Sequence, residues 1–328
     1  MSKNLFGFHS AFAGMLTGFV REKRAVGYKY GGATLRALRS LDRFFSSCGA
    51  DAKSLSRNLG EHFISRHAKT SPCAAWRRAL VWRQFAEYCR RQGMDAWSPE
   101  YSSFPIYRVD FCPFIYTRPQ VASLFAAVDV LPRLSRTPRR TANYSLLFRL
   151  LYGAGLRIGE ALALRICDWD QTSGVLRICQ GKNRKDRLIP LSPKLADRVT
   201  THIRQYADEA NMPLFLSPQG NHTLSCCVIN HTFRNTLLPQ AGLPPRHKRQ
   251  GPRIHDLRHT FAVHRLENWF LAGENIEAKL PYLAAYMGHT NIRDTYYYLR
   301  ITQSFFPEIT RRLEAKVGDI IPRMEDQP

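Results

Sequence analysis

Three consecutive tyrosines, Tyr296 to Tyr298, lie in the segment DTYYYLRI near the C-terminal end of the sequence. A tyrosine hydroxyl can attack a phosphodiester and form an ester that a second hydroxyl can later attack. Neighbouring side chains on a helix point about 100° apart, so the three hydroxyls cannot share one site. The segment therefore raises the question of which tyrosine, if any, is a nucleophile.

Four other short segments contain residues that suit phosphoryl chemistry. They are GAGLRIGEAL with Arg157, the polar turn GKNRKD with Lys182, HDLRH from His255 to His259, and MGHT with His289. Each segment alone is a weak signal. Their order along one chain is the stronger observation.

In this order the motifs resemble those of the tyrosine recombinases, the family of phage integrases and bacterial Xer recombinases. The resemblance covers residues 117–300 closely, whereas the N-terminal region matches that family's DNA-clamping domain only in outline. It implies a DNA strand transferase that forms a covalent 3′-phosphotyrosyl intermediate and needs neither a metal nor another cofactor nor ATP. The tyrosine nine residues past His289 is Tyr298. By motif, the family's catalytic residues fall on Arg157, Lys182, His255, Arg258, His289 and the nucleophile Tyr298.

The chemistry of these residue types agrees with the resemblance. Two arginines, Arg157 and Arg258, can hold the non-bridging oxygens of a phosphate through bidentate hydrogen bonds and replace a metal ion. Lys182 on a hairpin can protonate the departing 5′ oxygen, and His255 can exchange a proton with the tyrosine. Loss of either arginine is expected to remove nearly all cleavage.

Other interpretations of these residues remain open from the sequence. Arg157 could form a surface ion pair with Glu160, Tyr298 could be a core aromatic, and Lys185 competes with Lys182 in the same turn. In addition, HDLRH imitates the zinc motif HExxH, in which two histidines bind metal and a glutamate activates water. The zinc interpretation needs Asp256 in place of that glutamate, and it explains neither Arg157 nor the net charge.

The charge of the chain predicts a nucleic-acid partner. The 328 residues include 48 Lys and Arg against 26 Asp and Glu, a net charge of +22 with a pI near 10.1. Residues 1–108 contain 18 basic and 7 acidic residues, so the excess is not confined to one tail. A chain that is basic throughout suits binding to double-stranded DNA. The side chains proposed for DNA contact are Arg77, Arg78, Arg83 and Lys185.

The periodicity of apolar residues predicts a mainly α-helical fold with a small antiparallel β-hairpin in a two-domain DNA clamp. Helices are expected in segments 10–27, 33–49 and 72–93, and again from Thr117, while GVLRICQGKNRKDRLIPL alternates as a hairpin does. Residues 95–116 lose this periodicity and are expected to form the linker. The predicted domains are residues 1–108, a helical core-binding (SAM-like) domain, and residues 109–328, an α+β catalytic domain.

The eight cysteines show no CxxC pair and no zinc-ligand spacing, which predicts reduced, mostly buried thiols in a cytoplasmic, nucleoid-associated protein. The expected function is site-specific recombination or integration. A longer stretch between Arg258 and His289 and Asn183 after the lysine favour a divergent, mobile-element member. The alternatives are a DNA-binding accessory protein without cleavage activity and a type IB topoisomerase.

The resemblance also implies a homo-tetramer on paired sites, or a hetero-oligomer with related recombinases. Residues 307–321 are expected to form a helix that docks on a neighbouring protomer or on its own chain.

Overall fold

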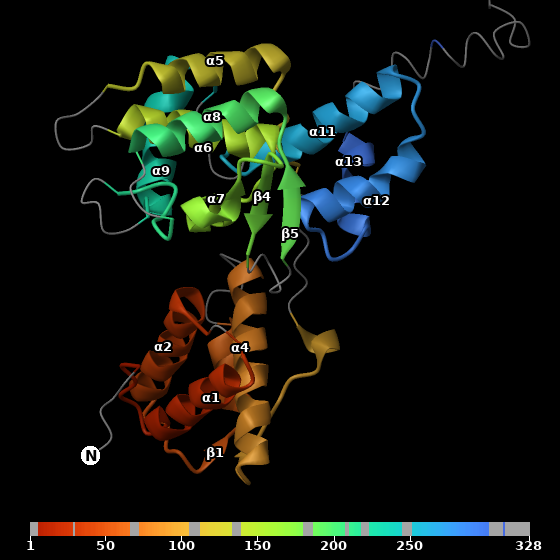
Figure 1. Cartoon of the computed structure of the whole chain (residues 1–328). Coiled ribbons are helices and arrows are strands. Elements are labelled where there is room, and N and C mark those ends of the chain that lie inside the picture. The colour runs from red at the N-terminus through yellow and green to blue at the C-terminus, as the bar shows by residue number, and fades with distance from the viewer. Residues whose placement is uncertain are drawn as a thin grey trace, which may run out of the picture. The chain divides into compact units, whose positions relative to one another are not determined.

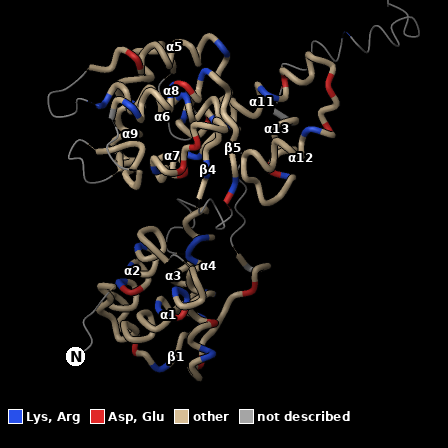
Figure 2. Tube along the Cα trace, viewed as in Figure 1, with Lys and Arg blue, Asp and Glu red and all other residues tan. Residues whose placement is uncertain are grey.

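The computed structural model describes residues 6–28, 30–65, 72–104, 112–132, 139–179, 186–206, 210–217, 223–244, 251–301 and 311. The chain divides into two compact units, Met1–Asp110 and Phe111–Pro328. The described part is mainly helical with a small antiparallel sheet, which confirms the predicted fold class (Figure 1). Lys and Arg positions are spread over both units (Figure 2).

Unit 1 is built from helices that enclose an aromatic core. Phe12, Phe45, Trp82 and Phe85 are almost fully buried, and the rings of Phe12 and Phe45 lie 4.3 Å apart between centroids. The helices are α1 (Ala13–Ala25), α2 (Gly32–Ser47), α3 (Arg57–Ser65) and α4 (Pro72–Arg91). Three of these four were predicted, and each ends two residues before the end of its predicted segment.

Two features of unit 1 were not predicted, namely α3 and a short parallel pair of strands. β1 (Ser54–Leu55) pairs with β2 (Asp95–Ala96), and the next residue, Trp97, accepts a hydrogen bond from the buried indole of Trp82 at 3.0 Å. Two-residue strands give no alternation that a sequence pattern could reveal. This pairing depends on contacts between segments about 40 residues apart in the chain.

Unit 2 begins with a helix whose N-terminus the sequence predicts correctly. α5 (Arg118–Asp129) starts after Thr117, whose hydroxyl accepts from the backbone N–H of Gln120 while the Gln120 amide oxygen accepts from the backbone N–H of Thr117. Such a reciprocal cap satisfies two backbone donors of the first turn. α6 (Arg140–Gly153) packs on α5, α8 and α11, and this explains why it carries apolar residues on every face.

The predicted hairpin is present, and it belongs to a sheet of three strands. β4 (Val175–Ile178) and β5 (Arg187–Pro190) pair antiparallel, and β3 (Trp169–Asp170) adds to the other edge of β4. Leu176, Ile178 and Ile189 are buried on one face, as the alternation requires. The turn of the hairpin, with Lys182 and Lys185, lies outside the described residues.

The remaining helices complete unit 2. They are α7 (Ile158–Ala163), α8 (Pro193–Tyr206), α9 (Cys226–Thr232), α10 (Leu238–Gln240), α11 (Asp256–Leu271), α12 (Ile276–Met287) and α13 (Arg293–Ile301). α13 contacts both α11 and α12, around a core that includes Phe261, Leu283, Met287 and Tyr298 (Figure 1). No helix in the described ranges is long and apolar enough to cross a membrane.

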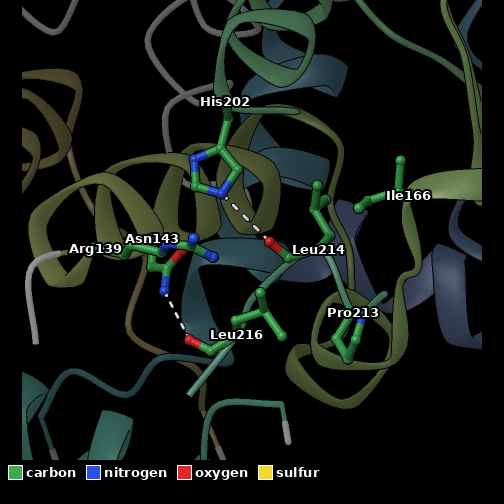
Figure 3. Close-up of a pocket in the computed structure, with 7 residues that line it drawn as sticks. All are labelled: Arg139, Asn143, Ile166, His202, Pro213, Leu214 and Leu216. Carbon is green, nitrogen blue, oxygen red and sulfur yellow. Dashed lines mark hydrogen bonds between the residues drawn. The ribbon is translucent and has the colours of Figure 1, made fainter. Parts of the chain in front are cut away.

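An irregular segment of unit 2 is fixed to the helices by buried polar groups. The side-chain amide of Asn143 donates to the carbonyl of Leu216 at 3.0 Å, and a ring nitrogen of His202 lies 3.3 Å from the carbonyl of Leu214 (Figure 3). Burial lowers the pKa of His202, so the ring is neutral and can donate to that carbonyl. The cavity between these residues is about 10 Å³, which holds one water molecule at most and excludes a substrate.

The cysteines differ from the prediction in burial. All eight thiols are unpaired, but only Cys89 is buried, Cys73 is partly buried, and the other six are exposed. The preference of cysteine for the interior is a statistical tendency. The prediction of mostly buried thiols was wrong because a residue's position on its helix or strand decides its burial. Two of the exposed thiols, Cys226 and Cys227, lie at the start of the short helix α9.

Candidate active site

The segment GAGLRIGE forms a sharp connection that presents Arg157 at the start of α7. Gly155 has φ +59°, and a side chain there would collide with the ring of Phe261, so the left-handed turn needs glycine for two reasons. One turn into α7, Glu160 reaches back and accepts from the Arg157 backbone N–H at 3.0 Å and from its Nη1 at 2.6 Å. The ion pair that the sequence suggested is therefore present, and it fixes the arginine.

Arg258 lies in the first turn of α11 and is only 2% exposed. Its Nη1 donates to the carbonyl of Gly155 and its Nη2 donates to the carbonyl of Met287, both at 2.6 Å. Burial and the neighbouring Arg157 lower the pKa of Arg258 to about 10, so the guanidinium is charged at neutral pH. These two bonds use two of its five N–H donors, and no described residue accepts from the remaining three.

The C-terminal end of α12 receives three arginines. The carbonyl of Tyr286 accepts from Arg187 at 2.9 Å, that of Met287 from Arg258 at 2.6 Å, and that of Gly288 from Arg157 at 3.2 Å. Carbonyls at a helix C-terminus lack partners within the helix and carry partial negative charge. The end of α12 therefore satisfies its own acceptors by holding the arginine cluster, which we define as Arg157, Arg187 and Arg258.

Glu160 is the carboxylate of this cluster. It pairs with Arg157 at 2.6 Å and with Arg187 at 2.8 Å, and Arg258 Nη1 lies 4.0 Å from its Oε2. Burial alone would raise the pKa of Glu160, but the hydrogen bonds from Arg187 and Arg157 outweigh it and lower the pKa to about 2. With one carboxylate for three guanidinium groups, the cluster retains an excess of positive charge suited to a phosphate.

Tyr298 is the tyrosine that faces this cluster. It is 2% exposed, whereas Tyr296 is 45% exposed and Tyr297 is partly buried. The Tyr298 hydroxyl lies 3.1 Å from Nδ1 of His259, and its ring stacks on that of His289 with centroids 6.1 Å apart. Burial raises the pKa of Tyr298, opposed by the positive charges of Arg258 and Arg157, so the hydroxyl is protonated at neutral pH.

Of the two histidines named by the resemblance, His289 stacks on this tyrosine and His255 packs on His259. His255 comes directly before α11, and its ring packs edge to face on that of His259, with centroids 4.9 Å apart. Loss of hydration and then the charge of Arg258 lower the pKa of His255. His289 follows the end of α12, and its Nδ1 lies 2.7 Å from the hydroxyl of Thr295.

A family model described as Phage integrase family matches residues 117–304. The chain belongs to the phage integrase family. It is therefore a tyrosine-type site-specific recombinase, a DNA-cutting and rejoining enzyme, as the motifs predicted.

Relatives of this integrase-family chain match three quarters of it or more. A putative integrase/recombinase, y4rB of Sinorhizobium fredii (strain NBRC 101917 / NGR234), is 30% identical over 316 residues, 94% of this chain and 99% of the relative. Tyrosine recombinase XerD of Ralstonia nicotianae (strain ATCC BAA-1114 / GMI1000) is 26% identical over 75% of each chain.

Solved structures share the fold of this family member at lower identity. XerH bound to its palindromic difH substrate in a post-cleavage complex gives a TM-score of 0.62 at 18% identity, over 92% of this chain and 84% of XerH. A lambda integrase (75–356) dimer bound to a COC′ core site gives 0.62 at 13% identity, over 86% of this chain and 94% of that one. This likeness concerns the fold.

The structure brings most of the predicted catalytic residues into one site. Arg157, His255, Arg258, His289 and Tyr298 surround the end of α12, while Lys182 lies outside the described residues. Sequence reasoning treated Glu160 only as an alternative partner of Arg157, and it missed Arg187 and the contact of His259 with Tyr298. The second histidine of HDLRH, one turn after the first, was the available signal for His259.

The zinc interpretation of HDLRH does not fit this arrangement. Asp256 would have to activate water, but its side chain is fully buried and both its oxygens accept from the guanidinium of Arg253, at 2.6 and 3.2 Å. Nδ1 of His259 lies against Tyr298. The carboxylate of Asp256 is thus occupied by an arginine, and Nδ1 of His259 by a tyrosine.

The arginines proposed for DNA contact in α4 differ in their surroundings. Arg77 is exposed, Arg78 lies over the ring of Phe63 at 5.6 Å, and Arg83 is held by several groups. The guanidinium of Arg83 donates to the carbonyl of Pro99 at 2.6 Å and pairs with Glu87 at 2.8 Å. Among these three, Arg77 is the side chain best placed to reach a phosphate. Lys185 lies outside the described residues.

Replacing Gly288 with alanine is expected to disturb the arginine cluster. Gly288 has φ +68°, and an added Cβ would lie 2.9 Å from Nη1 and 3.0 Å from Cζ of Arg187. Arg187 cannot move away easily, because it is bound to both Glu160 and Tyr286. We expect Gly288→Ala to lower the free energy of unfolding by about 2–3 kcal/mol, of which the left-handed backbone accounts for about 1 kcal/mol.

The control for this prediction is Gly273→Ala, measured by urea denaturation under the same conditions. Gly273 has φ +72° with no atom within 4 Å of an added Cβ, so it isolates the backbone contribution. Equal losses in the two variants would contradict a specific contact between position 288 and Arg187.

Proposed function

We propose that Tyr298 is the nucleophile of this recombinase and that Arg157 and Arg258 bind the scissile phosphate. The observation that carries the proposal is that, of three consecutive tyrosines, Tyr298 has its hydroxyl within the site formed by α11 and the end of α12. Attack of Tyr298 Oη on phosphorus breaks the bond to the 5′ oxygen and leaves the 3′ phosphate on the enzyme.

The two arginines act by stabilising the charge that develops on the non-bridging oxygens. Their guanidinium groups are already held by the backbone, so little reorganisation is needed when a phosphate arrives. His289, whose ring stacks on that of Tyr298, is the further residue proposed to contact the phosphate. Lys182, or Lys185 in the same turn, protonates the departing 5′ oxygen.

The partner in this proposal is double-stranded DNA that carries recombination sites. XerH and lambda integrase, which share the fold, were crystallised on DNA substrates. The net charge of +22 supports binding of the same polyanion here. We assign residues 1–108 to the DNA clamp, with Arg77 of α4 as a phosphate contact, and we propose a tetramer over two sites.

Mass spectrometry of the covalent adduct tests the nucleophile directly. Suicide duplexes with a nick near the cleavage point, tiled from the DNA that flanks the gene, lose a short 5′ fragment after cleavage and trap the intermediate. After nuclease and trypsin digestion, we expect the nucleotide remnant on Tyr298. A remnant on Tyr296 or Tyr297 would overturn the assignment, and tight binding without any adduct would favour an accessory protein.

A further inference from the structure

His259 makes the hydrogen bond to the proposed nucleophile that the family motifs assigned to another residue. Its Nδ1 lies 3.1 Å from Tyr298 Oη, with ring centroids 5.6 Å apart. His255, which the motif had assigned to proton exchange, packs its ring on that of His259. The nitrogen within hydrogen-bond distance of the Tyr298 hydroxyl therefore belongs to the second histidine of HDLRH.

The surroundings of His259 keep its ring neutral. Its neighbours are His255 and Arg258 on α11, Arg253 just before that helix, and His289 after α12. Burial is the main cause that lowers the pKa of His259 to about 3, and the charges of these neighbours add to it. A neutral ring in its Nε2–H tautomer presents Nδ1 as an acceptor to the Tyr298 hydroxyl, which still carries its proton.

We infer that His259 is the general base for Tyr298. This inference rests on the proposed function. As Oη bonds to phosphorus, its proton moves to Nδ1 of His259, and the bond from phosphorus to the 5′ oxygen breaks while that oxygen takes a proton from the hairpin lysine. In rejoining, a 5′ hydroxyl attacks phosphorus and loses its proton to the lysine, while the bond from phosphorus to Oη breaks and the imidazolium returns its proton to Oη.

Binding of DNA makes His259 a better base than it is in the free chain. Two of the groups that lower its pKa, Arg258 and His289, are those proposed to contact the phosphate. A phosphate in the site neutralises part of their charge, and its own negative charge favours the imidazolium. The pKa of His259 therefore rises towards the working pH when the substrate arrives, which is when a base is needed.

The experiment compares single-turnover cleavage by wild type, His259→Gln and His259→Ala between pH 5.5 and 9. Glutamine retains a hydrogen-bonding side chain but cannot accept the proton, so cleavage by His259→Gln should fall about 100-fold while DNA affinity is unchanged. The residual rate should rise with pH up to pH 9, because hydroxide replaces the missing base. Added imidazole should restore part of the rate to His259→Ala.

A second substrate distinguishes the general base for Tyr298 from the general acid that protonates the 5′ oxygen. A duplex with sulfur at the 5′ bridging position has a leaving group that needs no proton. It should restore cleavage to Lys182→Ala and leave the His259 variants slow. Rescue of His259→Gln by this substrate would assign His259 to leaving-group protonation and overturn the inference.

The matched control is His264→Gln on the same helix. His264 Nδ1 also lies 2.9 Å from a tyrosine hydroxyl, that of Tyr152, outside the arginine cluster. The His264→Gln variant should cleave DNA at the wild-type rate. Wild-type cleavage by His259→Gln, or a slow variant with an unchanged pH profile and no imidazole rescue, would reduce His259 to a structural residue. If wild type forms no adduct on Tyr298, the proposed function fails first.

Discussion

Tyr298→Phe is expected to abolish the covalent protein–DNA adduct and leave DNA binding intact. The substitution removes the oxygen proposed to attack phosphorus, and we expect no neighbouring tyrosine to replace it, because adjacent side chains on α13 point about 100° apart. The aromatic ring stays in its buried site against His289, so the cost to stability should be confined to the lost hydrogen bond, about 1 kcal/mol. Denaturing gels of suicide-duplex reactions measure the adduct, and fluorescence anisotropy measures binding.

The neighbouring tyrosines provide the matched controls for this variant. Tyr296→Phe changes an exposed ring and Tyr297→Phe changes a partly buried ring on the same turn of α13. Both should form adduct at close to the wild-type rate. Loss of adduct in Tyr297→Phe with retention in Tyr298→Phe would show that the reacting tyrosine is one position earlier.

Glu160→Gln is expected to have the largest effect on stability. It leaves Arg157, Arg187 and Arg258 close together without their carboxylate, in a site where Glu160 is only 7% exposed. Removal of one partner from a buried ion pair typically costs about 3–5 kcal/mol, because the remaining charges stay desolvated. Cleavage should also fall, since Arg157 loses the contact that orients it. Urea denaturation and single-turnover cleavage measure the two effects.

Asp129→Asn is the matched control for this carboxylate. Asp129 also accepts two hydrogen bonds from one arginine, Arg149, at 2.6 and 2.9 Å, but its side chain is 43% exposed. An exposed pair of this kind contributes about 1 kcal/mol or less. Equal destabilisation by the two substitutions would contradict the central position assigned to Glu160.

The low pKa of Glu160 makes the stabilisation by its ion pairs depend on pH. Its pKa is lowered from 4.5 to about 2, so the ion pairs stabilise the folded state fully above pH 4.5 and lose this effect as pH falls towards 2. The shift corresponds to roughly 3 kcal/mol. The difference in free energy of unfolding between wild type and Glu160→Gln should therefore shrink between pH 5 and pH 3. A difference independent of pH in this range would mean that packing, not charge, explains the variant.

The sequence predicted the local features of this chain well because each has a short-range cause. The cap at Thr117 needs only Gln120 three residues later, and the hairpin strands need only alternating apolar residues. The motifs proposed as catalytic were selected by order and spacing, and five of their six residues lie near one another in the structure. The sixth, Lys182, and the division of roles within its turn stay predictions.

The missed features depend on contacts between distant segments. Arg187 is an ordinary strand residue until β5 lies against α12, where it meets a carbonyl 99 residues away. Glu160 could be recognised as a partner of Arg157 from its spacing, but not as the shared partner of a second arginine 27 residues away. For His259, the motif indicated a chemically suitable ring, whereas only the packing of α11 on α13 showed that it contacts Tyr298.

The end of α12 has a consequence for how this enzyme tolerates mutation. The groups that hold Arg187, Arg258 and Arg157 are the backbone carbonyls of Tyr286, Met287 and Gly288, which no side-chain substitution can delete. Point changes at positions 286 and 287 can repack this region and still leave the arginine anchors in place. A one-residue insertion or deletion within α12 (Ile276–Met287) instead shifts the register of all three anchors together. Variation of this segment should therefore proceed by substitution at constant length.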